Sequence, residues 1–308
     1  MVGNVGNVGN VGNVGNVGNV GNVGGGGGAF FPDRVDLPFV AVRVPGAMPG
    51  SLVRLSDPAF RFGHAASFEK DWGATFKAWR VLDEFTATEA WQKRQRRDAT
   101  GVLVEQPGGL TIKTWQQMLD DPKRTLVQVV NAEIDDLVLK AESERADALG
   151  EILSQKDDFI DDFLGLLGTD AGRRKATFTL LNAVSLVALM AVMHFKLINN
   201  RRRPSQVCPA LNPPVSVPGH AAYPSGHATQ ALLIAATLGQ VFEGKMQKGA
   251  LTSVDALAER IAVNREIAGL HYASDTAAGQ LLAQALLPIL ETGDRFKEAL
   301  ADAQLEWS

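Results

Sequence analysis

Residues 178–204 read FTLLNAVSLVALMAVMHFKLINNRRRP, a strongly apolar stretch followed directly by a basic one. The first 18 of these residues include no Lys, Arg, Asp or Glu, which meets the lower limit for a membrane-spanning helix. A core helix covered by neighbours on every face has the same composition. Asn182, Ser185 and His194 interrupt the run, and the next strongly apolar segment, 231–242, has only 12 residues. We therefore expect a buried central helix at 178–195 and no membrane span.

Helical periodicity extends over much of the chain around this segment. Helices are expected from about Thr114, with Pro122 as a breaker, over 157–167 and over 253–268. Another helix beginning near residue 65 would have one apolar face, formed by Phe68, Trp72, Phe76, Trp79 and Leu82. Strands and helices do not alternate after residue 65, which argues against a doubly wound parallel sheet.

The first 28 residues hold seven copies of Val-Gly-Asn and a glycine run at 24–28. Gly and Asn cannot offset the entropy lost on ordering, so we expect a flexible low-complexity tail at 1–28. A mis-assigned translation start would look the same. No cationic region with a following leucine-rich region is visible, so no secretory signal is expected and the cytoplasm is favoured.

Composition excludes several classes of protein. A chain with 45% hydrophobic and 21% charged residues is not wholly disordered. Cys208 is the single cysteine, which excludes an internal disulfide framework and a cysteine-based zinc cluster. The net charge of −4 gives no general attraction to nucleic acid or to an anionic membrane. We expect no nucleic-acid partner.

The basic stretch KLINNRRRP places Lys196 at the end of the apolar helix and Arg203 just beyond it, before Pro204. A guanidinium group matches two phosphate oxygens at once, and an ammonium group acts as a point charge. Cations at a helix C-terminus are also favoured without any ligand. A solvated basic run and a nucleic-acid contact of the triplet 201–203 are therefore the alternatives to an oxyanion site.

The segment YPSGH at 223–227 precedes the apolar helix that begins near Ala228. Ser225 fits an N-cap, which would leave the backbone N–H groups of Gly226 and His227 at the positive end of the helix. His227 would then lie beside a bound anion, where it could donate or accept a proton near neutral pH. The alternative is an ordinary cap with a surface histidine.

The segment NREIAGLHYASD at 264–275 supplies Arg265, His271 and Asp275. Gly269 suits the position just past a helix C-terminus, and a second helix is expected to begin near His271. His271 and Asp275 are then four residues apart on one helix face. The carboxylate could fix the imidazole tautomer and leave the other ring nitrogen free to attack. A surface ion pair is the alternative.

The order and spacing of the three segments resemble the motifs of the type 2 phosphatidic acid phosphatase (PAP2) superfamily. Its pattern is Lys, six residues and Arg-Pro, then Pro-Ser-Gly-His, then Ser-Arg, five residues, His, three residues and Asp. The resemblance covers about 175–285. Asn264 departs from it, because the family usually has Ser at that position. Soluble bacterial acid phosphatases and vanadium-dependent haloperoxidases share these motifs.

The resemblance implies an all-α, helical-bundle core that gathers the motifs around one anion. It assigns phosphate binding to Lys196, Arg203, Ser225, Gly226 and Arg265. His271 would attack phosphorus and form a phosphohistidine, His227 would protonate the leaving group and then activate water, and Asp275 would orient His271. No metal or other cofactor is implied for this route. We expect a tail at 1–28 and a single helical domain at 29–308, with an N-terminal part of unassigned role (29–170) and a catalytic core (171–308).

The same site would bind vanadate in a haloperoxidase that oxidises halide with hydrogen peroxide. His271 would then coordinate vanadium, and His227 would act on bound peroxide. His220, seven residues before His227, matches a histidine of some bromide-oxidising members as a supporting residue, although a plain loop histidine is the alternative. We favour an acid phosphatase-like phosphomonoesterase acting on a small phosphoester or a lipid phosphate. The haloperoxidase is the second hypothesis, and a catalytically silent scaffold is the third.

Overall fold

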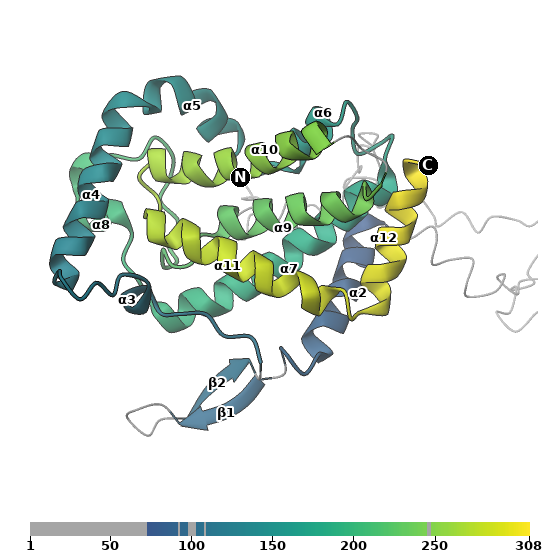
Figure 1. Ribbon diagram of the computed structural model, residues 1–308, viewed down its shortest axis with the longest axis horizontal. Coiled ribbons are helices and arrows are strands. Elements are labelled where there is room, and N and C mark those ends of the chain that lie inside the picture. The colour runs from purple at the N-terminus through teal and green to yellow at the C-terminus, as the bar shows by residue number, and fades with distance from the viewer. Residues whose placement is uncertain (1–72, 92, 98–102, 108, 245–247) are drawn as a thin grey trace, which may run out of the picture. The chain divides into compact units, whose positions relative to one another are not determined.

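The computed structural model describes residues 73–308 except 92, 98–102, 108 and 245–247 (Figure 1). The tail at 1–28 lies outside the described residues, and so do Phe68 and Trp72 of the helix expected from near residue 65. The described part from Ala74 onward belongs to one compact unit. The predicted domain boundaries stay a prediction.

Helices dominate the described residues, and the all-α prediction is confirmed apart from one small hairpin. In chain order the elements are α2 (Ala74–Ala87), β1 (Lys93–Arg97), β2 (Leu103–Pro107), α3 (Trp115–Met118), α4 (Leu126–Ser143), α5 (Arg145–Ser154), α6 (Ile160–Leu166), α7 (Lys175–Asn199), α8 (Pro204–Val207), a 3-10 turn (Pro209–Leu211), α9 (Gly226–Val241), α10 (Lys248–Ile267), α11 (Ala273–Leu290) and α12 (Asp294–Glu306).

The apolar segment forms α7, which packs against α2, α9 and α12 (Figure 1). The stretch Lys175–Val207 is long and apolar enough to cross a membrane by length and composition, and 67% of its most apolar window is buried inside the protein. This burial favours the interpretation of a core helix. Asn200, with φ 42°, ends α7 in the left-handed conformation, so the basic stretch turns back toward the bundle.

Two capping motifs determine where α9 begins and where α10 ends, and these two helices carry the other motifs. Ser225 is the N-cap of α9, as predicted, and its hydroxyl accepts a hydrogen bond from the Ala228 N–H at 3.4 Å. Gly269 follows α10 with φ +75°, and the N–H of Leu270 donates to the carbonyl of Arg265 at 3.0 Å. This is the hydrogen bond of a Schellman cap. It brings His271 to the start of α11.

Two features of the N-terminal part were not predicted from the sequence. One is the strand pair, in which β1 pairs antiparallel with β2. The other is the buried face of α2. In α2, Phe76 and Trp79 are 42% and 43% exposed, whereas the buried face is formed by Ala78, Val81 and Phe85. Both sets recur at helical spacing, and periodicity alone does not decide which stripe meets the core.

The crossing of α9 and α11 is close at Gly279. A Cβ at this position would lie 2.8 Å from the Ser225 carbonyl oxygen and 3.0 Å from the Ala228 Cβ. We predict that Gly279→Ala lowers the free energy of unfolding by about 1–3 kcal/mol, as overpacking does. Gly239→Ala in α9 is the matched control, because nothing lies within 4 Å of its added Cβ; it should gain about 0.5–1 kcal/mol. Urea unfolding measures both, and equal stability of the two variants would refute the close crossing.

Candidate active site

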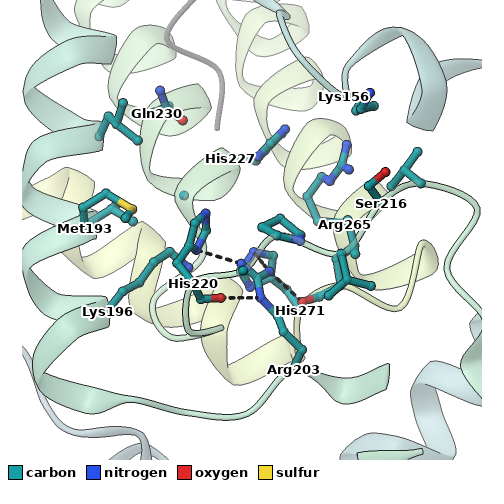
Figure 2. Close-up of a pocket in the computed structure, with 18 of the residues that line it drawn as sticks. Lys156, Met193, Lys196, Arg203, Ser216, His220, His227, Gln230, Arg265 and His271 are labelled. Carbon is teal, nitrogen blue, oxygen red and sulfur yellow. Dashed lines mark hydrogen bonds between the residues drawn. The ribbon is translucent and has the colours of Figure 1, made fainter. Parts of the chain in front are cut away.

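The three motifs meet at a cavity of about 270 Å³ (Figure 2). Among the predicted site residues, its lining includes Lys196, Arg203, His220, Gly226, His227, Arg265 and His271. Ser225 and Asp275 are fully buried and are not among the lining residues. The structure thus brings segments from α7, α9, α10 and the start of α11 to one place.

Lys196 lies in the last turn of α7 and is 2% exposed. Its Nζ donates to the carbonyl oxygens of Ala221 at 2.8 Å and Ala222 at 2.7 Å. Burial, and then the positive charge of Arg203, lower the pKa of Lys196 well below its ordinary value. Arg203 itself is 1% exposed. A solvated basic run is therefore the wrong interpretation for these two residues.

Arg203 lies between two histidines (Figure 2). Nη1 donates to the Leu270 carbonyl and to His271 Nε2, both at 3.0 Å. Nε donates to the His220 carbonyl at 3.1 Å, and Nη2 donates to His220 Nδ1 at 3.0 Å. His220 thus contacts Arg203 through both its backbone and its ring. Burial lowers the pKa of Arg203 to about 10, and burial followed by Lys196 lowers that of His220 to about 4.

Arg265 comes from the last turn of α10 and is 2% exposed. Its Nη1 is buried and has no hydrogen-bond partner among the described residues. Burial and then Arg203 lower its pKa to about 10. The described lining includes a single carboxylate, that of Asp157. Its Oδ2 lies 3.4 Å from Lys156 Nζ, and its side chain is more than half exposed. The cavity therefore carries an excess of buried positive charge, which suits an anion.

His271 has a defined tautomer. An arginine can only donate, so His271 Nε2 accepts the bond from Arg203, and Nδ1–H donates to Asp275 Oδ2 at 3.2 Å. The lone pair of Nε2 is therefore held at the cavity. Burial lowers the pKa of His271 well below its ordinary value, and Arg203 and Lys196 add to this effect. A lowered pKa favours the neutral ring, which a nucleophile requires.

Asp275 is fully buried and is held by more than His271. It accepts hydrogen bonds from Arg201 Nη1 at 2.7 Å and from the Tyr272 N–H at 3.1 Å. Burial raises the pKa of Asp275, and the charge of Arg201 acts against that rise. Ser225 donates its N–H to the Asp275 carbonyl at 2.9 Å, which ties the N-cap of α9 to the first turn of α11.

Arg201 and Glu133 are site residues that the sequence interpretation missed. Arg201 is 4% exposed, stacks over Tyr272 at 3.7 Å, and pairs with Glu133 Oε2 at 2.7 Å. Glu133 Oε1 accepts the N–H of Ser274 at 2.9 Å. A nucleic-acid contact of the arginine triplet is the wrong interpretation, because Arg201 and Arg203 are buried and only Arg202 of the three is exposed. The sequence offered one signal for Arg201, which lies two residues before Arg203 in the same basic stretch. It offered no signal that Glu133 would reach the site.

His227 lines the cavity and is not a surface histidine. Its Nε2 lies 3.0 Å from the backbone carbonyl of Gln155, and its ring centroid is 5.3 Å from that of Phe159. Burial and then Arg265 lower the pKa of His227 well below its ordinary value. In the part of the chain that the structure describes, no group of three His, Cys, Asp or Glu could hold a metal ion.

The comparison with protein families agrees with the motifs. Residues 177–292 match the model of the PAP2 superfamily. Among solved structures, the chain is similar to a transmembrane PAP2-type phosphatidylglycerolphosphate phosphatase from Bacillus subtilis, with 18% identity and a TM-score of 0.43 over 58% of this chain and 90% of that chain. No curated protein matches. The resemblance predicted from the sequence is confirmed for 177–292, which carry all three motifs.

Anion binding should take up protons. A dianion between Lys196, Arg203 and Arg265 would offset the charges that lower the pKa values of His227 and His271, so both pKa values should rise on binding. Sulfate affinity should increase as pH falls through the raised pKa values of these histidines in the bound state, by at most about tenfold per pH unit for each proton. Calorimetry in two buffers of different ionisation enthalpy measures the uptake. Sulfate binding without any proton uptake between about pH 5 and about pH 8 would contradict this account.

Arg201→Met should destabilise the protein by about 3–5 kcal/mol, because it leaves the buried Asp275 carboxylate without its cation. Arg202→Met is the matched control on the neighbouring exposed residue and should stay within about 0.5 kcal/mol. Loss of Arg201 raises the pKa of Asp275 further. The difference between the variants should therefore shrink as pH falls toward the ordinary Asp pKa of about 3.9. Urea unfolding of both variants at several pH values tests this, and a constant difference would argue against it.

Proposed function

We propose that this chain, whose residues 177–292 match the PAP2 superfamily, hydrolyses phosphate monoesters through a phosphohistidine, as an acid phosphatase-like enzyme. The observation that carries the proposal is the lone pair of His271 Nε2, fixed by Asp275 and held 3.0 Å from a buried arginine. A nucleophilic nitrogen, a carboxylate that orients it and a cationic cavity are the parts that phosphoryl transfer to a histidine needs.

The phosphoryl oxygens would be bound by the three buried cations. Arg265 Nη1 offers an unused donor. Arg203 donates to His271 Nε2, and it would exchange this bond for one to a phosphate oxygen as the ester enters. That exchange frees the lone pair of His271 at the moment when phosphorus arrives. Gly226 lines the cavity at the N-terminus of α9 and would add its N–H, and the motif assigns the Ser225 hydroxyl to the same task.

The reaction then proceeds in two displacements. His227 enters this step with both ring nitrogens protonated, because the bound dianion favours its charged form. His271 Nε2 attacks phosphorus, the bond from phosphorus to the ester oxygen breaks, and one of the His227 protons goes to the departing oxygen. Asp275 stabilises the positive charge on His271. Water next attacks phosphorus, gives a proton to His227, and the bond between phosphorus and Nε2 breaks to release phosphate. The chain's own cations offset the developing charge, so this route uses no cofactor.

One wall of the cavity is apolar, and it would pack against an ester with an apolar leaving group. Leu189, Val192 and Met193 of α7 line it. Both a small aryl or alkyl phosphate and a lipid phosphate meet this requirement. The vanadate-dependent alternative would use the same cations and histidines, and no contact in the cavity favours it over phosphoryl transfer. It stays a prediction that vanadate loading followed by a bromide oxidation assay tests.

Hydrolysis of p-nitrophenyl phosphate tests the proposal. The wild-type protein should turn over, and His271→Gln should lose at least about 10³-fold in kcat, because it removes the nucleophile. Arg202→Gln, which changes an exposed neighbour of the cationic stretch, serves as the matched control and should retain wild-type turnover. Full activity of His271→Gln would refute the mechanism. Bromide oxidation by vanadate-loaded protein without ester hydrolysis would support the alternative instead.

A further inference from the structure

Gln155 is a polar residue that is only 2% exposed, and it lies outside the PAP2 segment at 177–292. It follows α5 as the C-cap residue of that helix. We propose that Gln155 is a positioning residue that fixes the tautomer and orientation of His227, so that His227 Nδ1 is the atom that exchanges a proton with the ester. This inference rests on the function proposed above.

The hydrogen bond between Gln155 and His227 can run in only one direction. A backbone carbonyl can only accept, so His227 Nε2, at 3.0 Å, must carry the hydrogen. The neutral ring then has its lone pair on Nδ1. This atom has no hydrogen-bond partner among the described residues, while His227 lines the cavity. The carbonyl of Gln155 therefore selects which nitrogen serves the reaction.

The Gln155 carbonyl is itself held in place by the side chain of the same residue. Gln155 Nε2 donates to Asp162 Oδ2 at 3.1 Å, and Gln155 Oε1 accepts from Asn264 Nδ2 at 2.9 Å. Both ends of the amide are thus occupied, one by α6 and one by α10. Phe159 also packs its ring against His227. Gln155 and Phe159 together hold the imidazole from the N-terminal part of the chain.

Asn264 gains a role from this arrangement. It stands where the superfamily pattern has Ser, and its amide bridges Gln155 Oε1 and Glu151 Oε2, the latter at 3.0 Å. A serine hydroxyl is shorter and has a single hydrogen to donate, so it could not make both contacts. Asn264, in place of the Ser of the pattern, therefore supplies the hydrogen-bond donor that Gln155 Oε1 accepts.

This arrangement also affects proton transfer. Burial and the cations disfavour the charged form of His227, whereas the hydrogen bond to the Gln155 carbonyl favours it. A ring that loses this bond is protonated less often, so it supplies a proton to the ester oxygen less often, and it can rotate. Hydrolysis would then depend on how readily the ester oxygen leaves without a proton. That dependence separates a positioning role from a general structural one.

The test compares esters that need a proton with esters that do not. Gln155→Met keeps the backbone and side-chain length but removes both amide contacts. Relative to wild type, it should lose at least about 10²-fold more kcat/KM on phenyl phosphate, whose leaving group is the poorer one, than on p-nitrophenyl phosphate. Asn264→Ser should shift the ratio in the same direction by a smaller factor. Gln116→Met, on an exposed position of α3, is the matched control and should keep the wild-type ratio. An equal loss on both esters, or no change in the ratio, would overturn the inference.

A second measurement does not depend on activity. Nitrogen-15 NMR of the histidine side chains should show His227 as the Nε2–H tautomer in the wild-type protein and a mixture of tautomers in Gln155→Met. An unchanged tautomer in the variant, or Nδ1–H in the wild type, would overturn the inference. Absence of ester hydrolysis by the wild-type protein would instead count against the proposed function, and the tautomer measurement would still decide the role of Gln155.

Discussion

Three buried cations around one cavity are the constraint on which the rest of the structure depends. Lys196, Arg203 and Arg265 are each 2% exposed or less, and buried charges are costly unless they are paired or hydrogen-bonded. For Lys196 and Arg203 the protein meets this cost with carbonyl oxygens. Two accept from Lys196, and two others accept from Arg203. Carbonyls lower the cost without cancelling the charge, so the cavity keeps a positive potential that an anion can neutralise.

The helices are arranged to deliver these charges and the two histidines to one point. α7 ends where Lys196 meets the loop before α9. A glycine cap ends α10, and Arg265 and His271 line the cavity from the two ends of this tight turn. The close crossing of α9 and α11 at Gly279 places the N-cap Ser225 against Asp275. The nucleophile, its orienting carboxylate and the N-terminus of α9 are thus one packed unit. A change in that packing would alter the geometry of the site.

Local sequence was sufficient for the parts of the site that lie within short segments. The N-cap at Ser225, the glycine after α10, and the four-residue spacing of His271 and Asp275 follow from rules that act over one helical turn. Glu133 and Gln155 were not predictable in this way, because they reach the site from 68 and 72 residues away from their partners. Arg201 was visible, but its burial between aromatic rings and carboxylates depends on the tertiary fold. The strand pair β1–β2 and the buried face of α2 were missed for the same reason, since packing partners decide both.

The central claim is that His271 Nε2 takes the phosphoryl group, and direct detection of that bond tests it. Protein mixed with p-nitrophenyl phosphate, quenched in base within the first turnovers and digested to peptides, should show phosphate on His271 by mass spectrometry. Phosphorus NMR of the quenched protein should place that phosphate on Nε2. Continuing turnover with no phosphorylated His271, or with the phosphoryl group on another residue, would contradict the account.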